Sequence, residues 1–470
     1  MLLLYVDIMA CHDEVTGSCH LCVVKFPNKE TTKFIVDCGL FQEEKYTKYN
    51  ESFPFNPDSL DFCLITHNHV DHTGRIPMLV KNGFNGKIYA TKQTQAIMPI
   101  ALNDSVKVLS DVYKRKHQKP LYTETDVEKT IEMIEGLEYD KKYNISENIS
   151  VTFLSNGHLV GAAMILVQIT YPGEEDINLL FTGDYNCKNE FVDLKPLPDY
   201  VKDLRLTVIC ESTYGDMSAR DINYGYFQKT VMEEIQNSKT IIVPVFSLGR
   251  SQEILYKLKK MQEEGLISVD IPIYFDGKLA HAYTGMYLKC EGLIKEEMRD
   301  FLPKNLTYVD CTTRESLLNC DHCKIIVTTS GMGTYGPAQV YIPYFITESK
   351  ALILFTGYTA EGSLGANIRN AEVGDFVKIG GMIKRKKCSI SYCNEFSGHA
   401  KMEELLGLLH EFKNLRAVLL NHGEERSKQF FAERIYDEIE VKDVGILNRE
   451  FFFRIGSFGV EKTLSTKFKF

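Results

Sequence analysis

The chain has 470 residues, a mass of 53.7 kDa and a formal net charge of −9 at pH 7. This length is typical of two or three domains, and the 44% hydrophobic fraction is ordinary for a globular chain with a large core. The negative charge excludes a generally basic nucleic-acid coat, although a local basic cluster can still bind nucleic acid. No stretch approaches 18 consecutive apolar residues, so no membrane span is expected.

The first residues and the cysteines predict a cytoplasmic location. The first residues lack a basic segment, and an acidic residue, Asp7, stands among them. We therefore interpret this stretch as a strand rather than a signal peptide. The 13 cysteines are odd in number and scattered, which is typical of reduced thiols in a cytosol-like compartment. Two C-x-x-C pairs have the spacing of a structural zinc site, but they stand about 300 residues apart. We therefore interpret Cys19/Cys22 and Cys320/Cys323 as core or loop thiols.

The predicted elements change character along the chain. Short apolar runs and turn signals make the first 65 residues β-rich. From about residue 217 helices and strands alternate, which predicts a parallel sheet with helices on its faces. A capping box is expected at Thr125 and Glu128. The predicted strands are 20–24, 33–36, 62–65, 149–154, 163–169, 179–181, 240–245, 271–274, 324–329, 351–355 and 417–420, and the predicted helices are 125–138, 224–237, 251–263 and 401–412.

One short segment carries the strongest chemical signal. Thr66–Gly74 follows an apolar strand and holds His67, His69, Asp71 and His72 within six residues. Imidazole and carboxylate side chains together suit zinc, and also iron or manganese. On a strand-end loop the first two histidines can point to one ion, and the aspartate and third histidine to a second.

Three later residues have the position that further ligands would need. His158, Asp184 and His422 each follow a predicted strand, and each stands beside a glycine. Ligands at the ends of strands would gather at one edge of a sheet. Taken singly, each is more often a turn or surface residue. Together with the first motif they predict a metal centre.

These residues carry a family resemblance. The H-x-H-x-D-H motif followed by His158 and Asp184 resembles the metallo-β-lactamase superfamily. Glu211–Gly215, Phe396–His399 and Asn421–Glu424 resemble motifs A, B and C of the β-CASP nucleases. The segments 243–250 and 357–365 are also similar to β-CASP segments. Segments 14–19 and 37–42 look most like compact prokaryotic members, which in turn resemble the endonuclease subunit of the cleavage and polyadenylation specificity factor.

The resemblance implies a fold and a division into domains. The expected fold is α/β, a metallo-β-lactamase αββα sandwich with an inserted β-CASP α/β domain. The sandwich would take residues 1–215 and 386–470, and the inserted domain residues 216–385.

The resemblance also implies two zinc ions. His67, His69 and His158 would hold one ion, and Asp71, His72 and His422 the other. Asp184 would bridge both ions. Asp37 looks like motif I of the superfamily. It would not bind the ions itself but would orient the residues that do.

The implied reaction is hydrolysis of a phosphodiester bond in single-stranded RNA. A hydroxide bridging the metals would attack phosphorus, with His399 as the general acid for the leaving sugar oxygen and Glu211 orienting it. The products would carry 5′-phosphate and 3′-hydroxyl ends. Cutting would be endonucleolytic, with 5′ exonuclease action left open.

Substrate contacts are expected at backbone N–H groups of glycine-rich turns and at a helix start. The candidates are Arg250, Ser330, Gly331, Gly357 and Ser363. The basic run Lys384–Lys387 is a further candidate for contact with nucleic acid. Ordinary turns and a solvated charged face are the alternative interpretations.

Other functions remain open alternatives. A DNA nuclease of the same family is the nearest, although the motif C histidine His422 resembles the RNA-acting branch. A non-catalytic scaffold of an RNA-processing complex would be expected to lack ligands, and all seven ligand positions are filled here. A small-molecule hydrolase of the lactamase fold would not need the inserted domain. Beyond RNA, a homodimer and an RNA-processing complex are the partners considered.

Overall fold

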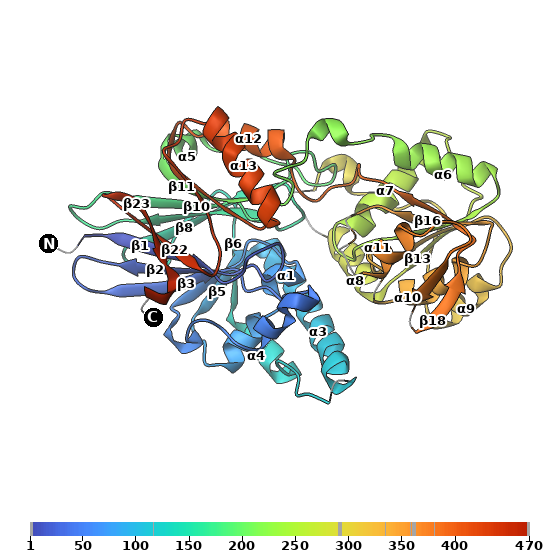
Figure 1. Cartoon of the computed structure of the whole chain (residues 1–470), viewed down its shortest axis with the longest axis horizontal. Coiled ribbons are helices and arrows are strands. Elements are labelled where there is room, and N and C mark those ends of the chain that lie inside the picture. The colour runs from blue at the N-terminus through green and yellow to red at the C-terminus, as the bar shows by residue number, and fades with distance from the viewer. Residues whose placement is uncertain are drawn as a thin grey trace. The chain divides into compact units, whose positions relative to one another are not determined.

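The computed structural model describes residues 3–115, 117–289, 294–333, 335–357, 359, 363–379 and 381–467. Tyr358, Ala360, Glu361 and Gly362 of the β-CASP-like segment 357–365 lie outside these residues. The chain divides into two compact units (Figure 1), Met1–Ala219 with His399–Phe470, and Arg220–Gly398. In the described ranges every cysteine is a free thiol, and no helix has the length and apolar character needed to cross a membrane.

The first unit contains two β-sheets packed face to face. Apolar residues from both sheets, such as Ile8 and Phe34 from one and Phe153 and Leu179 from the other, form the core between them. One sheet has the order β23 (Gly459–Leu464), β22 (Phe451–Gly456), β1 (Tyr5–Ala10), β2 (His20–Lys25), β3 (Thr31–Val36), β4 (Phe62–Leu64), β5 (Lys87–Thr91) and β6 (Ile134–Leu137). The other has the order β21 (Asp443–Ile446), β20 (Asn414–Asn421), β11 (Arg205–Glu211), β10 (Ile177–Phe181), β9 (Ala163–Ile169), β8 (Ile149–Ser155) and β7 (Lys142–Asn144).

Helices cover the outer face of each sheet, because successive strand residues point to opposite faces and both faces here are apolar. Leu179 faces the other sheet, whereas Leu180 packs under the helices. The αββα sandwich predicted from the sequence is therefore confirmed (Figure 1). The first sheet is covered by α2 (Ile76–Lys81), α3 (Lys92–Arg115) and α4 (Glu124–Met133), and the second by α5 (Asp199–Asp203), α12 (Met402–His410) and α13 (Glu425–Glu438). The short helix α1 (Val70–Thr73) lies between β4 and α2 in the chain.

Strand directions in the second sheet bring four chain segments to one edge. β10 runs parallel to β11, and β11 runs parallel to β20. β8 is antiparallel to β9, which is antiparallel to β10, so β8 also shares their direction. The carboxyl ends of these four strands therefore lie at the same edge. In open α/β sheets this is the edge where ligands bind.

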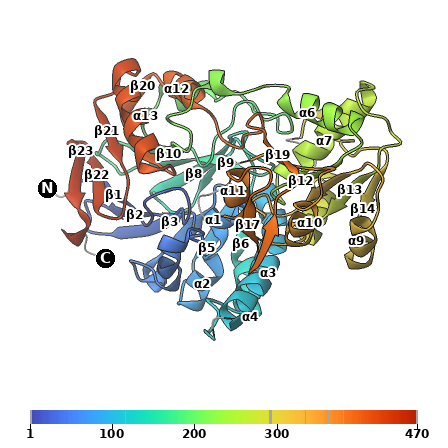
Figure 2. The ribbon, with the colours of Figure 1, turned by 45° about the vertical axis from the view of Figure 1, so that its right-hand side comes forward.

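The second unit is a parallel α/β domain (Figure 2). The six strands of its main sheet are all parallel, which matches the alternation of helix and strand in the sequence. The order is β14 (Leu306–Tyr308), β13 (Ile273–Asp276), β15 (Ile325–Thr328), β12 (Thr240–Pro244), β16 (Ala351–Phe355) and β19 (Ser389–Tyr392), and β17 (Phe376–Ile379) with β18 (Met382–Arg385) forms a separate hairpin. The helices are α6 (Tyr226–Gln236), α7 (Arg250–Glu263), α8 (Lys278–Tyr287), α9 (Cys311–Leu318), α10 (Ala338–Phe345) and α11 (Leu364–Arg369).

The structure differs from two local predictions. The helix predicted over 125–138 ends at Met133, because residues 134–137 pair with β5 as strand β6. Its capping box is formed by Thr123 and Asp126, two residues before the predicted pair: the Thr123 N–H donates to Asp126 Oδ2 at 2.8 Å. Sheet pairing here overrides the helical pattern.

The boundaries of the compact units also differ from the expected domain limits. The first lies at 219/220 rather than 215/216, and the second at 398/399 rather than 385/386. The second difference arises because β19 pairs in parallel with β16 of the inserted sheet. Residues up to Gly398 therefore belong with the second unit.

Candidate metal centre

The first sheet supplies one side of the site from the ends of β3 and β4. Asp37 follows β3 and is buried. Its Oδ1 accepts from the Thr66 N–H at 2.8 Å, and its Oδ2 accepts from the Thr66 hydroxyl at 2.7 Å and from His72 Nδ1 at 2.8 Å. One carboxylate thus fixes both the loop after β4 and the orientation of the His72 ring.

Two glycines allow the segments around the site to approach closely. A Cβ on Gly39 would lie 1.5 Å from the backbone oxygen of Asp71, so only glycine fits beside that loop. Gly183 has a φ of +56°, and a Cβ there would lie 2.9 Å from Cβ of Thr66. The glycine next to Asp184 therefore leaves room for the loop after β4.

The second sheet supplies the other side of the site from four strand ends. His158 follows β8, Asp184 follows β10, Glu211 ends β11, and His422 follows β20. These strands share one direction, so residues far apart in sequence meet at one edge. The structure brings together all seven predicted ligands and both predicted acid–base residues within the first unit.

Asp184 stands between two clusters of donor atoms. In one cluster, His67, His69, His158 and Asp184 have donor atoms within 4.8 Å of one another, and Asp71, His72 and His422 form the other. Oδ2 of Asp184 lies 3.3 Å from His67 Nε2 and 3.5 Å from His158 Nε2. Oδ1 lies 3.3 Å from His72 Nε2 and 3.5 Å from His422 Nδ1. Each carboxylate oxygen therefore faces a different pair of imidazoles.

The donor atoms fit metal ions. Zinc–nitrogen bonds of about 2.0–2.1 Å in a tetrahedron separate ligand nitrogens by about 3.3 Å. His158 Nε2 and His69 Nδ1 lie 3.1 Å apart, as do His72 Nε2 and His422 Nε2. Among the described residues, the buried atoms His67 Nε2 and Asp184 Oδ1 have no hydrogen-bond partner. Such buried polar atoms are costly unless a ligand satisfies them.

The electrostatics of the cluster also favour a cation. Burial lowers the pKa of His67 to about 3 and holds that of His158 well below its usual value, so both rings are neutral and offer a lone pair. At His72, burial again disfavours charge, but the carboxylates of Asp184 and Asp37 outweigh it and raise its pKa. These carboxylates favour positive charge at this point, which a divalent ion would supply.

His399 and Glu211 form a pair beside this cluster. His399 Nδ1 donates to Glu211 Oε2 at 2.9 Å, and His399 Nε2 lies 3.9 Å from Asp184 Oδ2. Burial opposes the charged ring, but Glu211 and then Asp184 raise the pKa of His399 to about 9. One possible metal-ligand atom from each of His399, Asp184 and His422 also lies within 4.8 Å of the others. His399 is therefore placed to hold a proton beside the candidate metal centre.

Several residues that support the ligands were assigned no role of their own from the sequence. The Thr213 hydroxyl lies 3.0 Å from His422 Nδ1, and Asn156 Nδ2 donates to the backbone oxygen of Asp184 at 2.7 Å. Asn421 Nδ2 donates to buried His20 at 2.8 Å and so fixes the residue before His422. Three of these four residues stand within two positions of a predicted site residue, which is the signal that could have found them.

The predicted substrate residue Arg250 makes its polar contacts within the second unit. It starts α7 and is only 9% exposed. Its Nη1 donates to the backbone oxygens of Thr356 at 2.6 Å and Phe396 at 2.5 Å, and its Nε lies 3.0 Å from Glu253. The guanidinium therefore joins three chain segments, and its contact with phosphate stays a prediction.

The other predicted substrate residues also lie in the second unit. A Cβ on Gly331 would lie 3.1 Å from the Phe246 backbone nitrogen, and one on Gly357 would lie 3.4 Å from the Phe246 ring. Ser330 Oγ accepts from the Tyr335 N–H at 3.3 Å, and Ser363 caps α11 by accepting from the Ala366 N–H at 3.2 Å. Close packing and capping account for these residue types, and phosphate binding by them stays a prediction.

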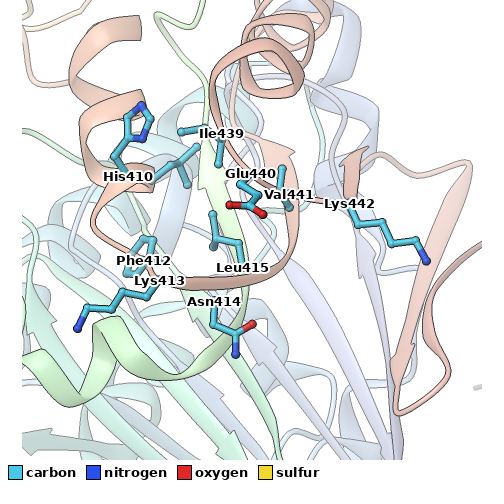
Figure 3. Close-up of a pocket in the computed structure, with 10 residues that line it drawn as sticks. His410, Phe412, Lys413, Asn414, Leu415, Ile439, Glu440, Val441 and Lys442 are labelled. Atoms are coloured by element: carbon cyan, nitrogen blue, oxygen red, sulfur yellow. The ribbon is translucent and has the colours of Figure 1, made fainter.

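A surface hollow of about 750 Å³ lies elsewhere on the first unit (Figure 3). It is formed where α12 leads into β20 and α13 into β21, and Lys413 and Lys442 point away from it. Asn414 begins the eight-residue strand β20, whereas His422 follows its other end. At about 3.3 Å per residue the two ends are about 23 Å apart, so this hollow is separate from the metal centre.

Family models match three parts of the chain. A metallo-beta-lactamase superfamily domain matches residues 26–192, and a Beta-Casp domain matches residues 251–368. A Zn-dependent metallo-hydrolase RNA specificity domain matches residues 384–445. These matches agree with the resemblance found in the sequence.

Curated relatives match over most of the chain. Ribonuclease TTHA0252 of Thermus thermophilus is 30% identical over 427 residues, which cover 88% of this chain and 91% of that protein. An RNase J-like protein of Methanocaldococcus jannaschii is 28% identical, with 90% of this chain and 95% of that protein covered. Transcription termination factor FttA of Methanosarcina mazei is 28% identical, with 93% of this chain and 69% of that protein covered. With its metal-binding geometry, its domain matches and these relatives, the chain belongs to the β-CASP family of RNA-processing nucleases within the metallo-β-lactamase superfamily.

Proposed function

We propose that the chain is a metal-dependent ribonuclease of RNA processing that hydrolyses phosphodiester bonds in single-stranded RNA. The observation that carries the proposal is the position of Asp184, whose two oxygens face two separate pairs of histidines. This is the donor arrangement that two ions sharing one carboxylate need. The relative named as a ribonuclease, which matches this chain along almost its whole length, supports RNA as the substrate.

Zinc is the metal that we assign to the centre. A set of histidines and aspartates suits zinc, and the matched RNA specificity domain is described as Zn-dependent. Two zinc ions held there would supply Lewis acidity and a water of lowered pKa for attack on phosphorus. His67, His69 and His158 would hold one ion, Asp71, His72 and His422 the other, and Asp184 both.

His399 is the residue that would protonate the leaving group. Its Nδ1–H is held by Glu211, so its Nε2 is directed towards Asp184 and the reaction centre. As the P–O bond to the 3′ oxygen breaks, a proton on Nε2 can pass to that oxygen. The products would be a 3′-hydroxyl and a 5′-phosphate.

Glu211 and Asp37 act on other residues rather than on the RNA. Glu211 Oε1 accepts from the Tyr185 N–H while Oε2 holds His399, so the acid cannot rotate away. Asp37 accepts a hydrogen bond from His72 Nδ1–H, which leaves the other ring nitrogen, His72 Nε2, to face Asp184. Partners of this kind set the tautomer and orientation of a ligand or acid.

Two parts of the proposal rest on residue types rather than on the geometry of the metal centre. RNA is preferred over DNA because histidine stands at motif C. The free thiols of the described chain support a cytoplasmic location. Endonucleolytic cutting is our first expectation, while 5′ exonuclease action, a homodimer and an RNA-processing complex stay predictions.

The direct test uses the purified chain and matched single-stranded RNA and DNA oligonucleotides, each labelled at the 5′ or the 3′ end. Incubation is carried out with and without a chelator, and the zinc content of the protein is measured in parallel. We expect internal cutting of RNA that stops when the chelator is present, with 5′-phosphate and 3′-hydroxyl ends.

Other outcomes would redirect the assignment. Mononucleotides released from the 5′ end would indicate an exonuclease. Preferential cutting of DNA would favour the DNA-nuclease alternative. A protein that holds zinc and cuts neither substrate would contradict the proposal and favour a scaffold or a small-molecule hydrolase.

A further inference from the structure

The hairpin of β17 and β18 in the second unit has two unlike faces. Val377 and Ile379 point inwards and are buried in the same apolar cluster as Ile368 of α11. They anchor the hairpin on the domain. The outward face is left without a covering element among the described residues, and Figure 1 shows β18 at the rim of this unit.

The outward face alternates apolar and basic side chains. Phe376 pairs with Arg385, and Lys378 pairs with Ile383 across the hairpin. Residues directly opposite one another share a face, and so do residues two apart along a strand. All four side chains therefore lie on one face, with an apolar residue and a basic residue in each cross-strand pair.

The apolar members of this face are unusually exposed. Ile383 is 74% exposed and Phe376 is 73% exposed, and no other large hydrophobic side chain of the described residues is more open to solvent. Val373 follows at 67%, within the same stretch of chain. Exposed apolar side chains gathered in this way mark interaction surfaces.

The charge of the hairpin is opposite to that of the whole chain. Over residues 372–387 there are five basic residues, Lys378, Lys384, Arg385, Lys386 and Lys387, and two acidic residues, Glu372 and Asp375. The local balance is 5 − 2 = +3, against −9 for the chain. In the described structure neither Lys378 nor Arg385 forms an ion pair. Arg385 Nε donates only to the Gly374 backbone oxygen, at 3.3 Å. The Lys378 and Arg385 side chains therefore remain available to an anionic partner, whereas Lys386 is buried and its Nζ donates to the Ala371 backbone oxygen at 2.6 Å.

We propose that this outward face, Phe376, Lys378, Ile383 and Arg385, is a docking surface for single-stranded RNA outside the metal centre. An unpaired base has a free face that can stack on an exposed aromatic ring, and the neighbouring cations can contact its phosphates. Charge and the aromatic ring favour this partner over an uncharged protein surface. The inference rests on the proposed ribonuclease function for its choice of RNA.

The test measures binding of a 30-nucleotide unstructured RNA to the full chain, in a chelator that stops cleavage, at several salt concentrations. We expect Phe376→Ala/Ile383→Ala to weaken binding about tenfold, because the bases can no longer stack on the hairpin. We expect Lys378→Glu/Arg385→Glu to reduce the slope of log affinity against log salt by about 1.4, at about 0.7 for each phosphate that is no longer neutralised. Duplex RNA should distinguish the two variants, because its bases are not free to stack: the apolar variant should bind it like the parent, and the charge variant should bind it more weakly.

Matched controls come from exposed residues of the same unit. Tyr224→Ala/Val269→Ala removes one aromatic and one aliphatic side chain, and Lys229→Glu/Lys350→Glu makes the same change in charge. Neither control should alter affinity or salt slope. All hairpin substitutions point outwards, so thermal unfolding midpoints should match the parent, and kcat for RNA should not change while KM rises.

The outcomes separate this inference from the proposed function. Hairpin variants that bind RNA like the parent would overturn the inference, and so would variants that change only self-association in sedimentation, because the face would then be a protein contact. If the parent binds RNA through the hairpin but does not cut it, the inference stands and the ribonuclease assignment fails. A parent that binds no RNA would overturn both.

Discussion

The metal centre of the first unit and the predicted phosphate contacts of the second differ in what their polar side chains face. In the centre, the buried atoms His67 Nε2 and Asp184 Oδ1 have no hydrogen-bond partner within the described chain. In the second unit, Arg250 donates to two backbone oxygens, and the Ser363 hydroxyl caps a helix. Histidines and carboxylates that converge on one another indicate a ligand, whereas a side chain bonded to backbone atoms of its own unit indicates a structural role.

Loss of the shared carboxylate should have the largest effect. Asp184→Ala removes the group that faces both histidine pairs, and His67→Ala removes a nitrogen from one of them. We expect both variants to lose cleavage and to bind less zinc, measured by RNA cutting and elemental analysis. Exposed Asp193→Ala and His410→Ala are the matched controls. Full activity in both site variants would contradict the metal mechanism.

Removal of the proton donor should have the next largest effect. For His399→Ala we expect kcat to fall about 10²- to 10⁴-fold, the range of general acid–base catalysis, while bound zinc stays near that of the parent. The two measurements together decide its role, because His399 also lies within 4.8 Å of donor atoms of Asp184 and His422. Loss of zinc along with activity would make it a ligand instead.

The residue that positions the acid should have a smaller effect. Glu211→Gln keeps the size of the side chain but removes the charge that holds His399 Nδ1–H at 2.9 Å. We expect kcat to fall about 10- to 100-fold, as for other residues that orient a functional group, with KM and zinc content little changed. A variant with the parent's kcat would show that His399 does not depend on this hydrogen bond.

Arg250 should affect stability more than catalysis. Arg250→Ala leaves the backbone oxygens of Thr356 and Phe396 without their donor, so the free energy of unfolding should fall by about 2 kcal/mol. Denaturant unfolding measures this change, and exposed Arg299→Ala should change stability by less than about 0.5 kcal/mol. A raised KM for RNA with unchanged stability would instead support the predicted phosphate contact.

Local patterns predicted the elements well where the pattern and the packing agree. The strand expected at 163–169 is β9 over the same residues, and the helix expected at 251–263 is α7 with one more residue at its start. The helix expected over 125–138 is wrong in its last third, because pairing with β5 turns that stretch into β6. A strand partner about 45 residues away in sequence cannot be inferred from a helical period.

The candidate site was predictable as a set of residues rather than as a geometry. Histidines and aspartates at strand ends, and their resemblance to a family, identified the side chains that the structure gathers around Asp184. Thr213, which lies inside motif A, and Asn156 were assigned no role because a threonine or asparagine within or beside a motif has no distinctive residue chemistry. The bonds of Arg250 were equally hidden, since its partners are backbone oxygens that any residue could supply.

The sequence by itself determined the α/β class, the family resemblance and the set of candidate ligands, because these depend on residue types and short spacings. The tertiary structure alone decided which oxygen of Asp184 faces which histidines, which arginine is already bonded, and where residues 386–398 belong. Those features arise from contacts between segments tens to hundreds of residues apart. They depend on the direction and pairing of whole strands, which no local stretch of sequence specifies.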